Sequence, residues 1–160
     1  MPKDENNIAL SPDLIRQAYR MGYFTMADAR EGGEINWYDP QLRGVLPLDR
    51  FHVPRSLQKI INRHPFLITF DRDFSGVIGG CADARPETWI NDEIIAVYEE
   101  LHSQGDAHSV EAWQLDAAGN RTLVGGVYGI ALGGAFFGES MFSVQSNASR
   151  VALVFLAARL

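Results

Sequence analysis

Hydrophobic residues recur at helical spacing in five segments of the chain. Ser11 is a good helix N-cap, Pro12 suits the first helical position, and Gly22 follows the last apolar residue. Asn91 begins the clearest of the later helices, in which the apolar residues share one face. The pattern therefore predicts helices over residues 11–22, 54–63, 73–81 and 91–105, and a last helix from residue 147 to the chain end.

Other segments have the composition of β-strands. Strands are expected at Gly44–Leu48, Phe66–Phe70, Ser109–Leu115, Thr122–Leu132 and Ala135–Phe142, and turn residues join the last three as hairpins. Residues 22–42, rich in Gly, Asp and aromatic side chains, are expected to be irregular. We therefore expect a small N-terminal domain over residues 1–42 and a second domain over residues 43–160.

The order of these elements predicts a fold class. The predicted order is a strand, helices, three antiparallel strands and a helix. This is the order of α+β proteins with an acetyltransferase-like (GNAT/Fem-type) domain and a mainly antiparallel sheet. The last strands of that fold have no counterpart in the sequence, and the final amphipathic helix has no cap. The pattern thus predicts a domain that is incomplete at its C-terminal end.

Charge is distributed unevenly along the 160 residues. The whole chain carries a formal charge of −6, but residues 43–63 carry +4 and the remainder −10. Within that basic segment Arg55, Lys59 and Arg63 recur at a spacing that places them on one helix face. Such a face can follow a phosphate backbone, although charge alone favours an ordinary solvated helix.

Several classes of site find no support in the sequence. The four histidines lack metal-ligand spacing, and the single cysteine, Cys81, excludes a disulfide framework and suits a reducing cytoplasm. No apolar run is long enough to span a membrane and no secretory signal is visible. Residues 143–150 contain no glycine, which disfavours a pyrophosphate-binding loop for acyl-CoA without excluding it.

Glu139 is the most informative single residue. It lies in the apolar segment Ala135–Phe142, where a charge is costly unless it is paired or meets a cationic ligand. Simple alternation places Phe137, Glu139 and Met141 on one strand face and Phe136 with Phe142 on the other. This pattern is equally consistent with two positions of Glu139. It either faces solvent or forms the floor of a pocket that binds an apolar group together with a cation.

Several motifs of the chain resemble those of one family. They are Leu10–Leu14, Met21–Phe24, Trp37–Pro40, Arg43–Pro47, Thr88–Ile90, His108–Glu111, Gly125–Gly129 and Gly138–Ser143. Together they resemble the leucyl/phenylalanyl-tRNA–protein transferases. The resemblance implies an aminoacyltransferase that moves Leu or Phe from charged tRNA to a protein with N-terminal Arg or Lys and marks it for degradation. It implies no metal or organic cofactor, and a cytoplasmic monomer is expected.

The resemblance also implies roles for particular residues. An apolar pocket for the amino acid and the terminal adenosine would include Trp89, Tyr98, Val127, Phe136 and Met141. Glu139 matches the family's pocket glutamate, and Arg55, Lys59 and Arg63 lie on what resembles its tRNA-binding helix. Thr25 and Met26 replace a Pro-Trp pair of many members, and the family's Asp and Gln pair would follow Leu160.

Three interpretations remain open on the sequence. The chain is either an aminoacyltransferase or a non-catalytic fragment that binds tRNA. The third possibility is an acyl-CoA-dependent N-acyltransferase on the same fold.

Overall fold

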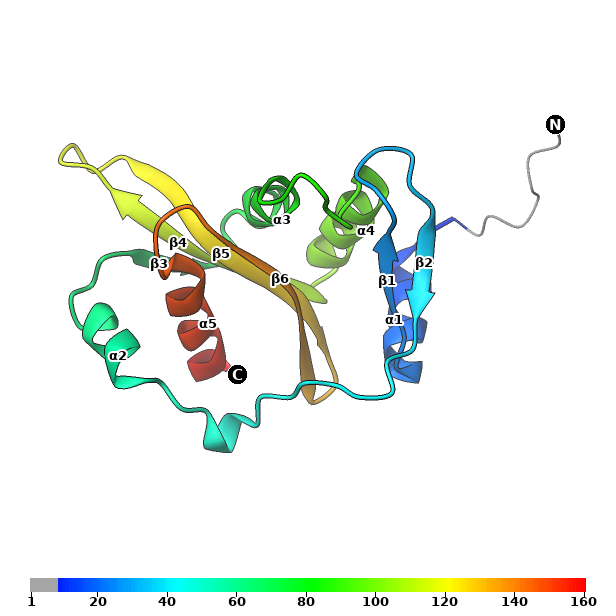
Figure 1. Cartoon of the computed structure of the whole chain (residues 1–160), viewed down its shortest axis with the longest axis horizontal. Helices are drawn as coiled ribbons and strands as arrows, with labels where there is room; N and C mark the ends of the chain where they lie inside the picture. Colours follow the sequence, from blue (N-terminus) through cyan, green and yellow to red (C-terminus); the bar gives the residue numbers. More distant parts are fainter. Residues whose placement is uncertain (1–8) are drawn as a thin grey trace, which may run out of the picture.

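The computed structural model describes residues 9–160 and is a mixed α+β structure (Figure 1). Its elements are α1 (Pro12–Met21), β1 (Phe24–Ala27), β2 (Ile35–Tyr38), the 3-10 turn η1 (Leu48–Arg50), α2 (Arg55–Ile61), β3 (Leu67–Phe70), α3 (Phe74–Asp83), α4 (Asp92–Ser103), β4 (Ala107–Leu115), β5 (Arg121–Leu132), β6 (Ala135–Ser143) and α5 (Ala148–Arg159). The α+β class expected from the sequence is confirmed.

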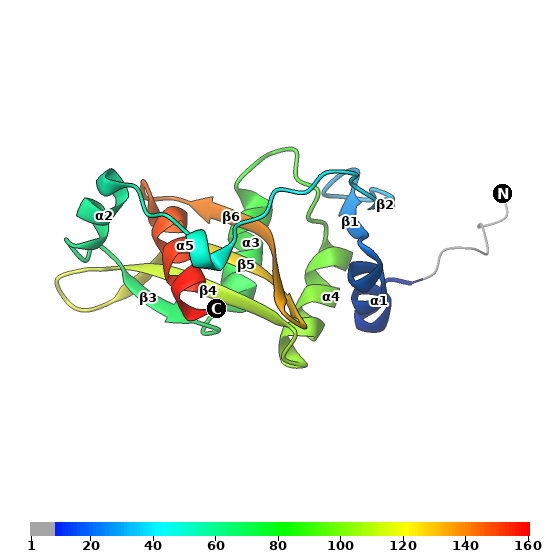
Figure 2. The ribbon, with the colours of Figure 1, turned by 90° about the horizontal axis from the view of Figure 1, so that it is seen from below.

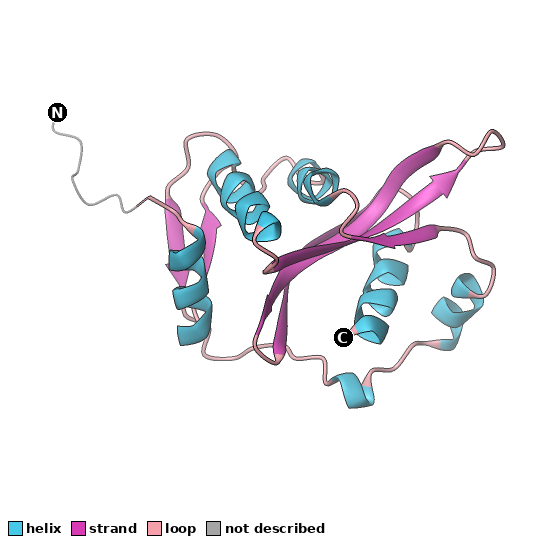
Figure 3. Ribbon diagram, turned by 180° about the vertical axis from the view of Figure 1, so that it is seen from behind, coloured by secondary structure: helices cyan, strands magenta, loops and turns pink. Residues whose placement is uncertain are grey.

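One antiparallel sheet of order β3-β4-β5-β6 organises the molecule. Helices α3 and α4 cover one face, and α5 covers the other (Figures 1 and 3). The larger core lies on the α3 and α4 side and includes Ile78, Ile94 and Tyr128. A smaller cluster beneath α5 includes Val127 and Leu156. The sheet is therefore buried on both faces, and β6 forms one of its edges.

The predicted helix starts are confirmed by their capping bonds. The side chains of Ser11, Asp73 and Asn91 each accept a hydrogen bond from a backbone N–H three residues later. Gly22 ends α1 with a φ of 93°, a left-handed conformation that glycine adopts without steric cost. Local side chain–backbone chemistry is thus sufficient to place these ends.

Two expectations for the first fifty residues are wrong. The segment Gly44–Leu48 is not a strand, because no other strand lies beside it to pair with its main chain. Residues 22–42 are not irregular, since β1 and β2 form an antiparallel hairpin within them. Each strand of that hairpin has only four residues, too few for an alternation signal, and stacking of Phe24 on Tyr38 supports it.

A β-bulge in β6 overturns the expected alternation around Glu139. Tyr128 pairs with Ser140 and Gly129 pairs with Gly138, so Glu139 is the additional residue without a partner on β5. Relative to the residues after the bulge, the β6 residues before it face the side of the sheet opposite to the one that simple alternation predicts. Phe137 therefore packs into the larger core, which also holds Phe142, whereas Phe136 packs beneath α5.

The N-terminal helix and hairpin pack against α4 and the loop before it. Ile15 and Tyr19 of α1 belong to the same core as α3 and α4. Arg16 forms an ion pair of 2.6 Å with Asp106, and the Ala27 N–H donates to the Trp89 carbonyl over 3.0 Å. These contacts fix α1 and β1 close to the free end of the β5–β6 hairpin. The division into two domains remains a prediction.

We predict that Gly129→Ala destabilises the protein by about 1–3 kcal/mol. A methyl group there would lie 2.1 Å from the Phe137 carbonyl oxygen and 2.5 Å from the Phe136 ring, so β6 would have to shift. Gly138→Ala is the matched control, because a methyl group at that position meets nothing within 4 Å. Urea unfolding of both variants measures the difference, and equal stabilities would contradict the prediction.

Candidate active site

A cleft of about 1050 Å³ opens beside the bulge of β6. One wall is formed by β6 residues 135–139, another by α5 near its C-terminal end, and a third by residues 42–49. We call residues 42–49 the strap, because they run between β2 and η1 beneath β6 and the end of α5 (Figure 2). The lining is mostly apolar and contains three charged side chains, Arg43, Asp49 and Glu139.

Glu139 lies at the cleft end of a chain of hydrogen bonds that begins at the buried Tyr98 hydroxyl. The Tyr19 hydroxyl donates to Glu139 Oε1 over 2.7 Å, and the hydroxyls of Tyr19 and Tyr98 are also 2.7 Å apart. Burial raises the pKa of the Glu139 carboxyl to about 7, although the tyrosine hydroxyls and the positive charge of Arg43 act in the opposite direction. Near neutral pH this carboxyl is therefore present in both protonation states.

Sequence reasoning missed the partner that positions Glu139. Tyr19 belongs to α1, 120 residues away in the chain, and its place on the apolar helix face indicated only a core residue. Burial also raises the pKa values of the Tyr19 and Tyr98 hydroxyls, so both remain protonated donors. The only signal in the sequence was a tyrosine at a core position, whose hydroxyl must find a partner when it is buried.

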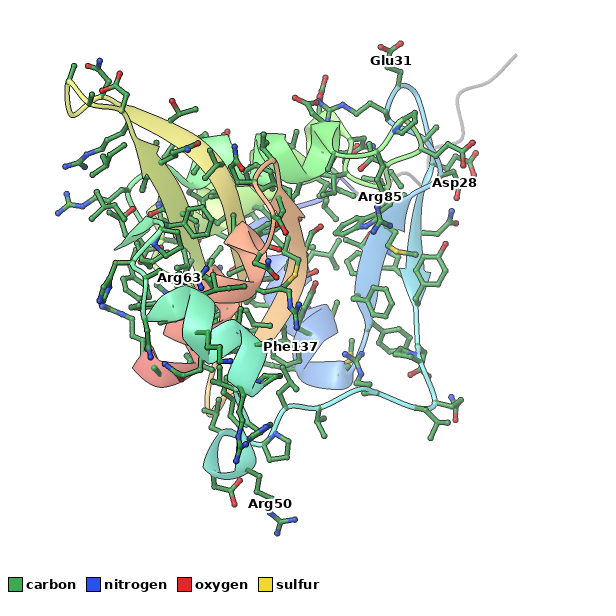
Figure 4. The ribbon with its side chains drawn as sticks, turned by 60° about the vertical axis from the view of Figure 1, so that its left-hand side comes forward. Asp28, Glu31, Arg50, Arg63, Arg85 and Phe137 are labelled. Carbon is green, nitrogen blue, oxygen red and sulfur yellow. The ribbon has the colours of Figure 1, made fainter. Side chains whose placement is uncertain are left out.

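The structure brings four of the predicted pocket residues together. The cleft is lined by Met26 of β1, by Trp89 of the loop before α4, and by Phe136 and Glu139 of β6. Phe137, labelled in Figure 4, lines it as well and contacts the Tyr19 ring edge-on with centroids 5.2 Å apart.

The other three predicted pocket residues lie outside the cleft lining. Tyr98 is fully buried and reaches Glu139 through Tyr19. Val127 is buried beneath α5, and Met141 is 40% exposed beyond the bulge. Their proposed roles in binding remain predictions.

Arg43 is a second residue of the cleft that was not among the predicted site residues. Its guanidinium donates to the Gly22 carbonyl and lies over the Phe24 ring, with the carbon 5.7 Å from the ring centroid. These contacts attach the start of the strap to the end of α1. They also bring a positive charge close enough to Glu139 to affect its pKa.

The basic residues of α2 lie outside the cleft. Arg55, Lys59 and Arg63 are exposed, and within residues 9–160 none of them forms an ion pair. The helix ends at Ile61, earlier than expected, so Arg63 lies in the turn that follows it. Figure 4 shows Arg50 projecting from η1 away from the molecule, on the same side as α2. These cations remain available for a phosphate backbone.

The turn from β6 into α5 offers little for an acyl-CoA pyrophosphate. The Ser149 N–H donates to Ser143 Oγ over 2.9 Å, and the Ser143 hydroxyl donates to Ser149 Oγ. An amide of the first helical turn is therefore already occupied by a side chain of the same protein, whereas anion sites at helix starts need such amides free.

The sheet, its helical layers and the apolar cleft define an α+β protein with a candidate active site. The model of the leucyl/phenylalanyl-tRNA protein transferase family matches residues 45–160, and the model of its N-terminal domain matches residues 9–41. The chain belongs to the leucyl/phenylalanyl-tRNA–protein transferase family. This result confirms the resemblance inferred from its motifs.

Relatives that carry the name leucyl/phenylalanyl-tRNA--protein transferase agree with this result. The protein of Ruegeria sp. (strain TM1040) is 54% identical over 96% of this chain and 70% of its own length. That of Roseobacter denitrificans is 54% identical over 94% of this chain and 69% of its own length. That of Zymomonas mobilis is 55% identical over 94% of this chain and 56% of its own length.

Two negative observations complete the description of residues 9–160. None of their helices combines the length and apolar character that a membrane crossing requires. Nowhere in this part of the chain do three or more His, Cys, Asp or Glu side chains gather closely enough to hold a metal ion.

We predict that the raised pKa of Glu139 makes stability depend on pH. The native protein binds this proton more tightly than the unfolded chain does, so the free energy of unfolding contributed by Glu139 falls as pH rises from 4.5 to 7. Glu139→Gln removes this dependence and should gain about 3 kcal/mol relative to wild type across that window.

Urea unfolding at several pH values measures this gain. Glu34→Gln, which removes an exposed carboxylate, is the matched control for the change in charge. A constant difference between wild type and Glu139→Gln from pH 4 to 8 would contradict the prediction.

Proposed function

We propose that this protein transfers Leu or Phe from aminoacyl-tRNA to the α-amino group of a protein acceptor. Family membership supports the reaction class, since the relatives named above are leucyl/phenylalanyl-tRNA--protein transferases. The observation that carries the proposal is a carboxyl with a pKa of about 7 at the end of an apolar cleft. Such a site can hold an apolar aminoacyl group beside an amine.

The reaction needs positioning more than activation. The acceptor nitrogen forms an amide bond with the aminoacyl carbonyl carbon, and the ester bond from that carbon to the tRNA ribose oxygen breaks. The ribose oxygen leaves as a hydroxyl, so one proton passes from the amine to the leaving group. An ester is already activated, and holding the two reactants together supplies much of the acceleration.

Glu139 is suited to accept an earlier proton, the one that the acceptor ammonium loses before it attacks. An α-ammonium group has a pKa of about 7.7–8.0 and must lose a proton before it attacks. Transfer to a carboxylate with a pKa of about 7 costs only about 1 kcal/mol, against more than 4 kcal/mol for an ordinary glutamate. Tyr19 then serves as a positioning residue, because its hydroxyl fixes Oε1 of Glu139, and within the described residues the other carboxylate oxygen has no hydrogen-bond partner.

The lining of the cleft supports the choice of amino acid. Trp89, Phe136 and Phe137 offer aromatic surface to a Leu or Phe side chain, and Met26 offers a polarizable one. We also propose that the acceptors begin with Arg or Lys and that the transfer marks them for degradation. We further propose that the enzyme is a cytoplasmic monomer. The negative charge of Glu139 beside the cleft favours a cationic acceptor.

The two alternatives are separated by binding and transfer. A non-catalytic tRNA-binding fragment would bind charged tRNA without forming a product. An acyl-CoA-dependent enzyme would bind acetyl-CoA, which the occupied α5 amide disfavours.

The first test is transfer of labelled Leu or Phe from charged tRNA to a protein that begins with Arg. The chain is assayed as it stands and within a chimera in which it replaces the matched part of the Ruegeria relative. We expect transfer by the chimera to rise with pH through about 7 as Glu139 ionises. Glu139→Gln should lower the rate at least tenfold and abolish this rise, without weakening tRNA binding.

The controls of this test decide between its outcomes. Glu34→Gln should retain both the rate and the pH profile. A wild-type rate in Glu139→Gln would exclude Glu139 as the proton carrier, and binding of acetyl-CoA without any aminoacyl transfer would overturn the proposed reaction.

The second test concerns the basic residues on and just after α2. If Arg55, Lys59 and Arg63 meet phosphates, replacing all three by Ala should weaken tRNA binding whichever amino acid is attached. It should also reduce the slope of log affinity against log salt by about 2, since each lost contact removes roughly 0.7–0.9.

A salt titration of tRNA affinity measures the slope. The matched control replaces Arg20, Arg72 and Arg85, three other exposed arginines, so that the net charge changes equally. Equal slopes for the two triple variants would mean that α2 does not bind the tRNA backbone.

A further inference from the structure

Arg16 joins α1 to the turn between α4 and β4. Its Nε donates to Asp106 Oδ2 over 2.6 Å, and its guanidinium also donates to the side-chain oxygens of Gln104 and of Asp13 on its own helix. The Arg16 side chain is only 19% exposed and that of Asp106 28%, so solvent screens this ion pair less than a surface pair. Because a guanidinium donates in fixed directions, these bonds restrict how α1 can rotate or slide against the turn.

Asp106 is bonded through its main chain as well. Its N–H donates to the Leu101 carbonyl of α4 over 3.0 Å, and its carbonyl accepts from the Ala131 N–H of β5 over 2.8 Å. Ala131 pairs with Phe136 in the hairpin whose second strand carries Glu139. One residue therefore connects three elements, α1 through its side chain and both α4 and β5 through its main chain.

The hydroxyl chain at Glu139 spans the same part of the structure. Tyr19 follows Arg16 by about one turn of α1, and Tyr98 lies on α4. The Tyr19 hydroxyl is 2.7 Å from the Tyr98 hydroxyl and 2.7 Å from Glu139 Oε1. Hydrogen bonds weaken steeply when distance and angle depart from their optimum. Both bonds therefore require α1 to keep one position between α4 and the β5–β6 hairpin.

We propose that Arg16 and Asp106 are positioning residues, which hold the Tyr19 hydroxyl on Glu139 by fixing α1 against the turn between α4 and β4. The inference rests on the proposed function, because the carboxyl positioned in this way is the proton acceptor of that reaction. Among the described residues that line the cleft, neither Arg16 nor Asp106 is included. The pair thus acts on Glu139 through Tyr19 and not by direct contact.

The direction of the effect follows from the groups around Glu139. The titratable side chains there come from five parts of the structure, namely Tyr19 of α1, Cys81 of α3 beside Ser140, Tyr98 of α4, Tyr128 of β5 and Arg43 of the strap. The Tyr19 hydroxyl lowers the pKa of the Glu139 carboxyl, because it stabilises the ionised form. The charges of Arg16 and Asp106 are not among the causes that shift this pKa. Displacement of Tyr19 should therefore raise the pKa of Glu139.

The direct test is a titration of the Glu139 carboxyl by carbon-13 NMR, with its signal assigned from the Glu139→Gln variant. We expect its pKa of about 7 to rise by about 0.5–1 in both Arg16→Gln and Asp106→Ala. These variants separate position from charge, because they change the net charge in opposite directions. A pure charge effect would raise the Glu139 pKa in the first variant and lower it in the second. Opposite shifts, or no shift in either variant, would overturn the positioning role.

Three further variants show whether the effect passes through Tyr19. In Tyr19→Phe, which lacks the hydroxyl, adding Arg16→Gln should leave the Glu139 pKa unchanged. Asp106→Asn keeps an acceptor oxygen and should raise the pKa less than Asp106→Ala does. Val124→Ala, in the separate cluster beneath the start of α5, should lower the urea midpoint without moving the pKa. A further rise in the double variant, or an equal rise in Val124→Ala, would contradict the inference.

The pH profile of transfer in the chimera measures the consequence for the reaction. A pKa that is higher by about 0.5–1 lowers the ionised fraction of Glu139 at pH 7 about two- to fivefold. The transfer rate of Arg16→Gln should fall by the same factor at pH 7 and largely recover by about pH 8.5, whereas a loss of folded protein lowers the rate at every pH.

The two measurements also separate this inference from the proposed function. Shifted titrations without any transfer by the wild-type chimera would overturn the transferase proposal and leave the positioning role standing. Unshifted titrations together with normal transfer would overturn the positioning role alone.

Discussion

The hydrogen bond from the Tyr19 hydroxyl to Glu139 Oε1 joins the N-terminal helix to the edge strand of the sheet. It requires α1 to be packed against α4, and the core around Ile15 and Tyr19 provides that packing. It also requires the bulge in β6, which places Glu139 outside the regular ladder of β5. The cleft depends on both conditions, because its lining includes Tyr19 of α1 and residues 135–139 of β6.

A second buried carboxylate shows why Glu139 differs from a structural acid. Glu111 of β4 is fully buried and accepts hydrogen bonds from the hydroxyls of Ser109 and Thr69 and from the N–H groups of Arg72 and Asp73. These four donors come from its own strand, the neighbouring strand and the turn into α3, which they fix. Glu139 has the tyrosine donors on one side and the cleft on the other, and so retains an oxygen for a ligand.

The distribution of charge separates two tasks. Exposed cations gather on and after α2, whereas the cleft is apolar and slightly negative. In the proposed reaction, with a large anionic substrate and a cationic acceptor, this separation would keep RNA phosphates away from the carboxyl that we propose meets the amine. The family assigned by motifs and comparisons fits such an arrangement.

The sequence by itself determined the helix starts at Ser11, Asp73 and Asn91, the two late hairpins and the family, because caps, turns and motifs are local features. It also singled out Glu139, since a carboxylate in an apolar strand is visible without a structure. Only the tertiary structure decided that Tyr19 meets Glu139, that a bulge reverses the faces of β6, and that the expected strand at residues 44–48 is an unpaired strap. These features depend on which distant segments lie side by side, and alternation along one strand carries no information about its neighbours.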